Sequence, residues 1–461
     1  MSPQVLDAAQ LHANERVQVV IVGAGACGLT AALALHRLGV ECVVLERDAV
    51  PSGSTALSSG FIPAPGTRAQ KTLGIDDSPD RFAQDIQTKA KGTAAPDLVS
   101  AYSQAIGPAL DALADAHGLV WHVLDNFLYP GHSVHRMHTV PEKTGVALMQ
   151  RLQAACDAAG VMIVTQARVT ELWADQQHVI EGVGYTRPDA SVERVRCGAV
   201  ILACNGFGGH PDLVKQLLPE MATALYAGHA GNDGSAIQWA RQLGARTADL
   251  GGYQGHGSWA VPQGALITWA LMVEGGVQIN AQGQRFHDET QGYSESAVQV
   301  LAQPEGMAWD VFDTPLLELA QTFPDFCDAQ NAGAVKTFDD IAALARHIGC
   351  EVATLTHTLD AVRPGTCAQT GRVFRHGLST PLHAVRVTGA LFHTQGGVDI
   401  NSACQVLQVS GQPLPNLLAA GGAARGVSGN AVWGYLSGNG LLSAVAGGHI
   451  AAHTAAACLK A

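Results

Sequence analysis

Residues 17–47 have the order of a strand, a glycine-rich turn, a helix and a second strand. The apolar run Val19–Val22 predicts a short buried strand, and the turn 23–28 (GAGACG) has the spacing G-x-G-x-x-G. The Ala- and Leu-rich segment after it predicts a helix that Gly39 ends. The second strand, residues 41–45, leads into Glu46, 18 residues after the last glycine of the turn.

Each part of this unit suits the binding of a dinucleotide. Gly23 allows a tight turn, Gly25 lets the main chain approach a pyrophosphate, and Gly28 lets the helix pack closely on the strand. The helix N-terminus offers free N–H groups, and the Glu46 carboxylate can accept hydrogen bonds from ribose hydroxyls. Residues 17–35 are apolar enough to suggest a membrane span, but their glycine and threonine interruptions favour a buried strand–turn–helix instead.

The composition indicates a large α/β enzyme and excludes several other classes of protein. At 461 residues, 47% of them hydrophobic and 52 of them glycine, the chain has room for two or three domains with many tight turns. The net charge of −12 argues against nucleic acid and anionic membranes as partners. The ten cysteines form no C-x-x-C pair, so no haem, zinc or iron–sulfur spacing is present. Residues 1–16 lack the pattern of a signal peptide, and we expect a cytoplasmic protein without a membrane span.

Further segments have small or polar residues where a parallel sheet would present them to a ligand. Loop 51–60 (PSGSTALSSG) carries hydroxyls and glycines that suit a phosphate and a flat ring. The apolar strand Ala199–Cys204 ends in NGFGG, and residues 230–234 (AGNDG) open a helix. A long helix of small residues begins near Gly438, and its N-terminus is a second place for partial positive charge.

The remaining pattern predicts a discontinuous domain with an insertion. We expect an α/β fold in which residues 1–245 and 380–461 form a Rossmann-type domain and residues 246–379 form an inserted α+β domain. Other expected elements are helices over 76–118, 145–159, 297–303 and 338–348, a meander of strands over 161–164, 169–173 and 179–185, and strands within 380–400.

His132, His135 and His138 are spaced by three residues, which could suggest a metal site. No acidic residue accompanies them nearby in the sequence, and the three rings need not share one face of the chain. We therefore expect no metal.

Together the motifs resemble those of the flavoprotein superfamily that includes the fumarate reductase and succinate dehydrogenase flavoprotein subunits and the 3-ketosteroid dehydrogenases. The resemblance covers most of the chain and rests on the GAGACG turn with Glu46 and on the segments STALSSG, AVILACNGFGG, AGNDG, GQRFHDE, HTQGGVDI and AAGG…SGNGLL. It implies an FAD-binding domain of Rossmann type and a capping domain over the flavin.

The resemblance also implies which residues contact FAD. In the succinate dehydrogenase branch a histidine in the STALSSG loop holds FAD covalently; the matching position here is Ser54, so we expect non-covalent FAD. No haem or iron–sulfur motif is present, and a separate electron donor or acceptor is therefore expected. The implied FAD-binding residues are Gly23, Ala24, Gly25, Ala26, Cys27, Gly28, Glu46, Arg47, Ser54, Thr55, Ser58, Ser59, Gly60, Val169, Ala203, Asn205, Gly206, Asn232, Asp233, Gly421, Gly422, Asn439, Gly440, Leu441 and Leu442.

Two departures from the fumarate reductase pattern bear on the substrate. Fumarate reductases have a proton-donating arginine shortly after R-F-x-N-E, where this chain has Tyr293, and a carboxylate-binding arginine before the final G-N, where this chain has Tyr435. Arginine suits bidentate binding of a carboxylate, whereas a phenol suits a ketone oxygen or proton transfer. Tyr435 with Ser437 resembles the ketosteroid dehydrogenases, while His256 and His393 match substrate-binding histidines of the fumarate reductases.

The resemblance therefore implies α,β-desaturation of a ketone, or the reverse reduction of an enone. We expect Tyr435, helped by Ser437 or the Gly440 N–H, to hold the carbonyl oxygen and Tyr293 to transfer the α-proton. His393 is expected to orient the substrate or to share the proton path. The two tyrosines could exchange roles. A free tyrosine has a pKa near 10, so a tyrosine base needs a nearby cation or donors, for which His256 and Arg285 are candidates.

Two other interpretations stay open. The chain could act on a di- or tricarboxylate, as a fumarate reductase or tricarballylate dehydrogenase does, with Arg425 and the histidines binding the acid groups. It could also bind flavin as a redox-linked partner without turnover. The substrate in the favoured interpretation is a cyclic or steroid-like ketone.

Overall fold

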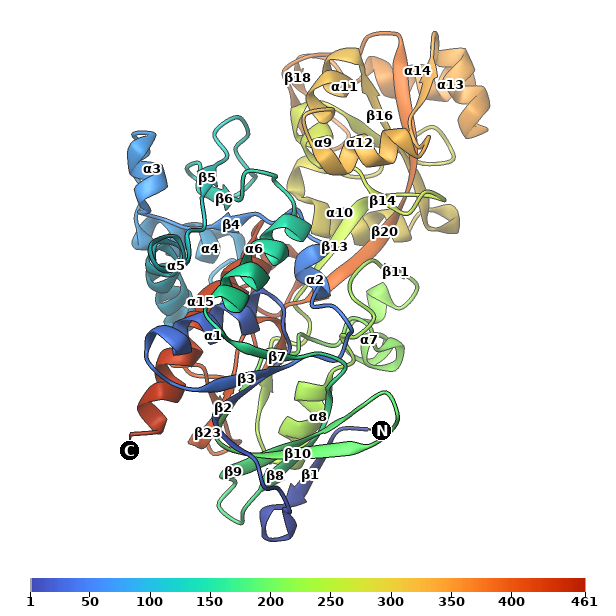
Figure 1. Cartoon of the computed structure of the whole chain (residues 1–461). Coiled ribbons are helices and arrows are strands. Elements are labelled where there is room, and N and C mark those ends of the chain that lie inside the picture. The colour runs from blue at the N-terminus through green and yellow to red at the C-terminus, as the bar shows by residue number, and fades with distance from the viewer. Residues whose placement is uncertain (1, 461) are drawn as a thin grey trace. The chain divides into compact units, whose positions relative to one another are not determined.

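The structure is a computed structural model that describes residues 2–460 and contains two compact units (Figure 1). Unit 1 comprises the chain up to Leu218, Gly228–Tyr253 and the chain from His393. Unit 2 comprises Pro219–Ala227 and Gln254–Phe392. Unit 2 begins eight residues after, and ends thirteen residues after, the inserted domain expected from the sequence, and it includes a short earlier segment that the sequence assigned to the other domain.

The centre of unit 1 is a parallel sheet. Val19, Val20 and Ile21 in its middle strand have no exposed surface, as expected for a strand that is covered on both faces. Neighbouring strands run in the order β7 (Met162–Val164), β3 (Cys42–Leu45), β2 (Arg16–Val22), β10 (Val192–Leu202) and β23 (Pro413–Ala419), all parallel. The carboxyl ends of these strands therefore meet at one edge of the sheet.

The first half of β10 belongs to an antiparallel extension with β9 (Ile180–Thr186), β8 (Arg168–Ala174) and β1 (Gln4–Asp7), of which only β1 pairs in parallel. The expected meander is wrong for its first strand, because β7 pairs with β3 at the far side of the sheet. The physical reason lies between β7 and β8. Gln166 has a φ of 53°, and the N–H groups of Gln166 and Ala167 donate to the Asp48 and Glu46 carbonyls instead of closing a hairpin.

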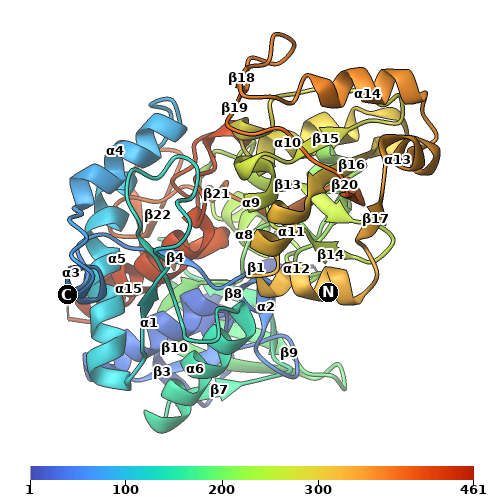
Figure 2. The ribbon, with the colours of Figure 1, turned by 90° about the horizontal axis from the view of Figure 1, so that it is seen from above.

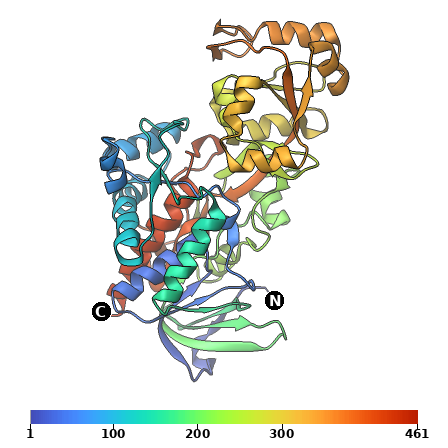
Figure 3. The same ribbon diagram turned by 45° about the horizontal axis from the view of Figure 1, so that its top comes forward.

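Helices cover the sheet of unit 1. Helix α15 (Asn439–Cys458), red in Figure 1, packs against α1 (Ala26–Arg37) and α5 (Pro96–His117), and α1 also contacts α6 (Gly145–Ala158), as Figure 3 shows. Helix α15 is long and apolar enough to cross a membrane, but here it packs against α1, α5 and β23. Other helices of unit 1 are α2 (Gly53–Ala56), α3 (Arg68–Thr72), α4 (Pro79–Lys89), α7 (Pro211–Leu217) and α8 (Ser235–Gln242).

Unit 2 contains a mixed sheet with helices around it (Figure 2). Its long strand β20 (Leu382–Thr394) pairs with β16 (Met307–Asp313), and the sheet continues to β15 (Val277–Ile279) on one side and to β13 (Tyr253–Ala260) and β14 (Ala265–Leu266) on the other. Short strands β11 (Leu225–Tyr226) and β17 (Lys336–Phe338) also pair with β20. The helices are α9 (Ala270–Glu274), α10 (Tyr293–Leu301), α11 (Thr314–Ala320), α12 (Pro324–Asn331), α13 (Ile341–Ile348) and α14 (Val352–Asp360).

Short strands complete both units. In unit 1 a small sheet joins β4, β6 and β5, a two-stranded sheet joins β12 and β21, and β22 pairs with β23. In unit 2 the hairpin β18–β19 stands by itself. Their bounds are Ile62–Pro63 (β4), His122–Val123 (β5), Met137–Thr139 (β6), Thr247–Ala248 (β12), Gly365–Thr366 (β18), Val373–Phe374 (β19), Gly397–Val398 (β21) and Gln405–Leu407 (β22).

Candidate active site

The glycine-rich turn between β2 and α1 has the geometry expected of a dinucleotide site. Gly23 has a φ of 106°, which disfavours any side chain, and a Cβ on Gly28 would lie 1.9 Å from the Gly23 carbonyl oxygen. The Glu46 carboxylate is buried at the end of β3, where its Oε2 accepts the Ala24 N–H at 2.8 Å and its Oε1 accepts the Asp48 N–H at 2.9 Å. The acid is thus fixed beside the turn.

The loop 51–60 folds partly into α2 and lies against the same turn. Thr55 Oγ1 accepts the Ala26 N–H at 3.1 Å, at the start of α1. Ser54 Oγ accepts from the side-chain amides of Asn205 and Asn232, at 3.0 and 2.9 Å. The structure therefore brings loop 51–60 together with two segments that lie 151 and 178 residues after Ser54 in the chain, and all three were expected from the sequence to bind one cofactor.

A charged cavity of about 340 Å³ lies next to the end of β3. Arg47 and Arg168 line it, and both guanidinium groups bind Asp233 Oδ2, at 3.4 and 2.9 Å. Arg47 also donates to the Gly231 carbonyl at 2.8 Å. Because Glu46 precedes Arg47, this cavity adjoins the carboxylate expected to bind ribose.

The other predicted cofactor residues lie at strand ends or in helix starts of unit 1. Val169 is buried in β8, Ala203 follows β10, and Gly421 and Gly422 follow β23. In the loop after α2, the Gly60 N–H donates to Ser58 Oγ at 3.1 Å. Cys27 is buried in the first turn of α1. The remaining predicted residues lie after α2 (Ser59), after β10 (Gly206) and in the first turn of α15 (Leu441 and Leu442).

The start of α15 presents main-chain N–H groups without a side-chain cap. Gly438 precedes the helix with a φ of 87°, and a Cβ on Gly440 would lie 2.8 Å from His393 Nε2. Asn439 donates to Ser428 Oγ at 2.9 Å, but its buried Oδ1 has no partner among residues 2–460. Burial lowers the pKa of His393 to about 4, so its imidazole is neutral near pH 7.

Tyr435 and Ser437 precede α15 and are both buried. The ring of Tyr435 meets the His393 ring edge to face, with centroids 5.5 Å apart. Gln395 Nε2 lies 3.2 Å from His393 Nδ1, and Gln395 Oε1 accepts from Ser428 Oγ at 2.7 Å. Unit 1 thus groups a phenol, a serine, a neutral imidazole and a helix N-terminus.

Unit 2 carries the second group of predicted catalytic residues. His256 lies between Tyr293 and Phe392, with ring centroids 5.0 and 5.5 Å apart and nearly parallel planes, and the Trp269 ring meets it edge to face at 5.7 Å. The Ser258 N–H donates to His256 Nδ1 at 3.1 Å. The neutral ring therefore carries its proton on Nε2.

The expectation that a cation beside Tyr293 assists it is not supported for either candidate. Burial lowers the pKa of His256 to about 3, so this ring is neutral near pH 7. The Arg285 guanidinium binds both oxygens of the buried Glu289, which Arg372 also binds, and it lies 3.3 Å from Cys367 Sγ. The sequence did not show that Arg285 and Arg372 share one buried carboxylate, that of Glu289.

Arg425, the candidate for binding a substrate carboxylate, also forms ion pairs with carboxylates of the protein. Its Nη2 binds Asp249 Oδ2 at 2.7 Å and its Nη1 binds Asp399 Oδ1 at 3.0 Å. A substrate acid would have to compete with two carboxylates already in place.

Comparison with known proteins decides the family. The FAD binding domain family matches residues 18–441. The chain belongs to this family. FAD is its cofactor, and the expectation of an FAD-dependent oxidoreductase that acts on carbon–carbon bonds is confirmed at this level.

Related proteins align with most of the length of this flavoprotein. A probable fumarate reductase of Shewanella frigidimarina is 26% identical over 451 residues, which covers 96% of this chain and 75% of that protein. The 4-oxocyclohexanecarboxylate 2-dehydrogenase of Sinomonas cyclohexanicum is 23% identical over 507 residues, with 88% and 87% covered.

Two solved structures share the fold of this flavoprotein. An open flavocytochrome c3 fumarate reductase gives a TM-score of 0.84 at 24% identity, over 98% of this chain and 80% of that one. The 3-ketosteroid-Δ4-(5α)-dehydrogenase of Rhodococcus jostii, solved with 4-androstene-3,17-dione, gives 0.78 at 24% identity, over 99% and 100%. The expected α/β fold with a Rossmann-type FAD-binding domain is confirmed.

The residues of unit 1 fit the cofactor of this family. A Cβ on Gly25 would meet no atom closer than Thr55 Oγ1 at 3.6 Å, so the turn leaves its main chain open to a pyrophosphate. At the start of α15, Asn439 Oδ1 is an acceptor without a partner in the described part of the chain. When bound, FAD supplies the acceptor or donor of a hydride.

Three residues that contact the predicted groups were not predicted from the sequence. Gln395 and Ser428 connect His393 to Asn439, and Phe392 stacks on His256. Gln395 lies two residues after His393 in the segment HTQGGVDI, and this position next to a predicted site residue could have indicated it. Ser428 lay in a glycine-rich loop with no distinguishing pattern.

Proposed function

We propose that this flavoprotein removes hydrogen from the C–C bond α,β to the carbonyl of a cyclic or steroid-like ketone, or adds it in the reverse direction. The observation that carries the proposal is the chemistry of the two residue groups. Tyr435 and Tyr293 stand where the fumarate reductase pattern has arginines, and the candidates Arg285 and Arg425 are bound to protein carboxylates.

The residues of unit 1 suit the carbonyl end of such a substrate. The Tyr435 hydroxyl, with Ser437 or the Gly440 N–H, donates hydrogen bonds to the ketone oxygen, which acidifies the α-carbon. His393 orients the substrate as a neutral imidazole, consistent with its lowered pKa. A protonated histidine would favour a carboxylate more than a ketone.

Tyr293 of unit 2 transfers the α-proton in this proposal. Neutral His256, stacked on its ring, supports the orientation of the phenol and offers Nε2–H as a donor. The aromatic surroundings of Trp269 and Phe392 suit an apolar substrate. A separate electron donor or acceptor, non-covalent FAD and a cytoplasmic location belong to the same proposal.

The second candidate is a di- or tricarboxylate substrate. The relationship to a probable fumarate reductase favours it, and His256 and His393 keep positions that bind substrate in that pattern. Against it stand two phenols in place of two guanidinium groups. The name of the Sinomonas relative, a dehydrogenase of a cyclic keto acid, is consistent with ketone chemistry within the same relatives.

Steady-state assays with product analysis test the choice. The holoenzyme is incubated with an artificial electron-accepting dye and in turn with substituted cyclohexanones, 3-ketosteroids, succinate and tricarballylate. The proposal predicts a product two hydrogens lighter from a ketone and none from the acids. Conversion of an acid alone would replace the proposal by the carboxylate candidate.

A further inference from the structure

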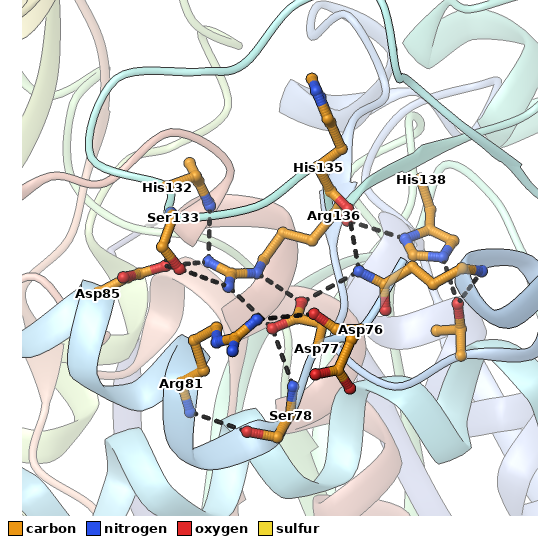
Figure 4. A network of polar contacts seen from close by, with 12 residues as sticks. Asp76, Asp77, Ser78, Arg81, Asp85, His132, Ser133, His135, Arg136 and His138 are labelled. Carbon is orange, nitrogen blue, oxygen red and sulfur yellow. Dashed lines mark hydrogen bonds and ion pairs between the residues drawn. The ribbon is translucent and has the colours of Figure 1, made fainter. Parts of the chain in front are cut away.

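A buried polar network in unit 1 has no place in the proposed chemistry (Figure 4). At its centre Arg136, which has no exposed surface, binds Asp77 through Nε and Nη2 at 2.9 and 3.0 Å. Its Nη1 binds Asp85 of α4, and the guanidinium lies over the Phe82 ring at 4.7 Å. The His132 ring also stacks on Phe82, with the two ring centroids 6.1 Å apart.

The hydrogen bonds of His132 fix which nitrogen carries the proton. Arg136 Nη1 lies 3.2 Å from His132 Nδ1, and because a guanidinium only donates, Nδ1 must accept. His132 Nε2 lies 3.0 Å from the Ser437 carbonyl oxygen, and because a carbonyl only accepts, Nε2 must carry hydrogen. The ring is therefore neutral and donates to the main chain of Ser437.

That carbonyl belongs to the segment that carries the proposed ketone-binding groups. Tyr435 stands two residues before Ser437, and Gly438 and α15 follow directly. Leu436 of the same segment packs against Gly131, the residue before His132, since a Cβ on Gly131 would lie 2.7 Å from Leu436 Cδ1. A shift of about 1 Å in such a segment can lower a catalytic rate a hundredfold.

We propose that His132, held in its Nε2–H form by Arg136, is a positioning residue that fixes the Ser437 carbonyl and thereby aims Tyr435 and the N-terminus of α15. The inference rests on the proposed function for Tyr435. Its effect on the flavin rests instead on the expectation that the residues at the start of α15, Asn439 to Leu442, contact FAD. A network of Asp77, Asp85 and Arg136 that served only to stabilise the fold would not require a donor at the Nε2 position.

Two amide substitutions of His132 distinguish loss of the Nε2–H donor from loss of the ring itself. The side-chain nitrogen of His132→Gln reaches the position of Nε2 and can donate to Ser437. His132→Asn places its amide near Nδ1, too short to reach that carbonyl. Both variants and the wild type are purified with FAD, and the flavin midpoint potential, kcat and KM for an accepted ketone are measured.

We expect His132→Gln to match the wild type in potential and in kcat. We expect His132→Asn to lose at least about tenfold in kcat with KM little changed, and its flavin potential to become more negative because the helix N-terminus stabilises the reduced flavin less. Equal potentials and equal kcat values in all three proteins would overturn the proposal. If no ketone is turned over, the proposed function fails, but the potentials still decide this inference.

A measurement on the wild type covers the case in which His132→Asn does not fold. Long-range ¹H–¹⁵N spectra of histidine-labelled protein, with the His132 signal assigned by its absence in His132→Gln, report the tautomer. The proposal predicts a neutral ring with the proton on Nε2 at pH 7. A proton on Nδ1, or on both nitrogens, would overturn it.

Discussion

The imidazole ring of His256 stacks on the phenol ring of Tyr293, with centroids 5.0 Å apart and an interplanar angle of 17°. Because burial keeps this imidazole neutral, the contact orients the phenol without placing a cation beside it. The stack therefore orients the phenol, and the group expected to assist Tyr293 is the His256 Nε2–H donor rather than a cation.

Replacement of Tyr293 by Phe should leave FAD binding intact and lower turnover of the ketone by a factor of about 10² or more, as for loss of a proton-transfer group. Flavin content and steady-state rates check this. Tyr185→Phe is the matched control, because that hydroxyl donates to Glu193 on the β9–β10 hairpin. Wild-type turnover in Tyr293→Phe would remove this residue from the mechanism.

Tyr435→Phe should lower kcat about 10²- to 10³-fold, since a donor to the developing enolate oxygen would be lost. Ser437→Ala should cost less if the Gly440 N–H shares that role. The comparison is made under saturating ketone, so that a change in binding does not disguise a change in rate. A pure rise in KM with unchanged kcat would assign Tyr435 to substrate binding alone.

Arg425→Met should destabilise the fold rather than weaken acid binding. It would leave Asp249 and Asp399 without this guanidinium, and breaking a buried pair costs on the order of 3 kcal/mol. Arg246→Met is the control, since that side chain also binds Asp399 but is 41% exposed, against 19% for Arg425. Denaturant unfolding measures both. Unchanged stability together with a raised KM for a carboxylate would instead support the carboxylate candidate.

Stability should fall as the pH is lowered from about 6.5 to about 4. Burial lowers the pKa of His132, His138 and His393 to about 4 and that of His256 to about 3, whereas unfolded histidines titrate near 6.5. In this window the unfolded chain binds protons that the folded chain does not, so each histidine removes up to about 1.4 kcal/mol per pH unit. Each loss levels off below the folded pKa. Unfolding free energies that stay constant between pH 6.5 and 5 would contradict this account.

Much of the fold could be predicted because its signals are local. The strand, turn, helix and acid of residues 17–47 form β2, α1 and β3 as expected, and the helix expected over 145–159 is α6. The pairing of β7 could not be predicted, because it depends on main-chain bonds between Gln166 and Asp48 rather than on the pattern of either strand.

The candidate site was harder to predict than the fold because its electrostatics come from distant residues. Arg136 binds Asp77 and Asp85, which lie 59 and 51 residues earlier in the chain. The segment with the three histidines therefore has no acidic residue near it in the sequence. Arg425 is bound by Asp249, 176 residues earlier. Among residues 2–460 no group of three or more His, Cys, Asp or Glu side chains is placed to hold a metal ion.

The central claim is that the tyrosines serve a ketone and not a carboxylate. Anaerobic mixing of the oxidised holoenzyme with a single ketone or acid, followed at the flavin absorbance near ~450 nm, tests it most directly, because no electron acceptor has to be known. The account predicts rapid bleaching by a cyclic ketone or 3-ketosteroid and none by succinate or tricarballylate, with bleaching lost in Tyr293→Phe. Bleaching by an acid and by no ketone would contradict it.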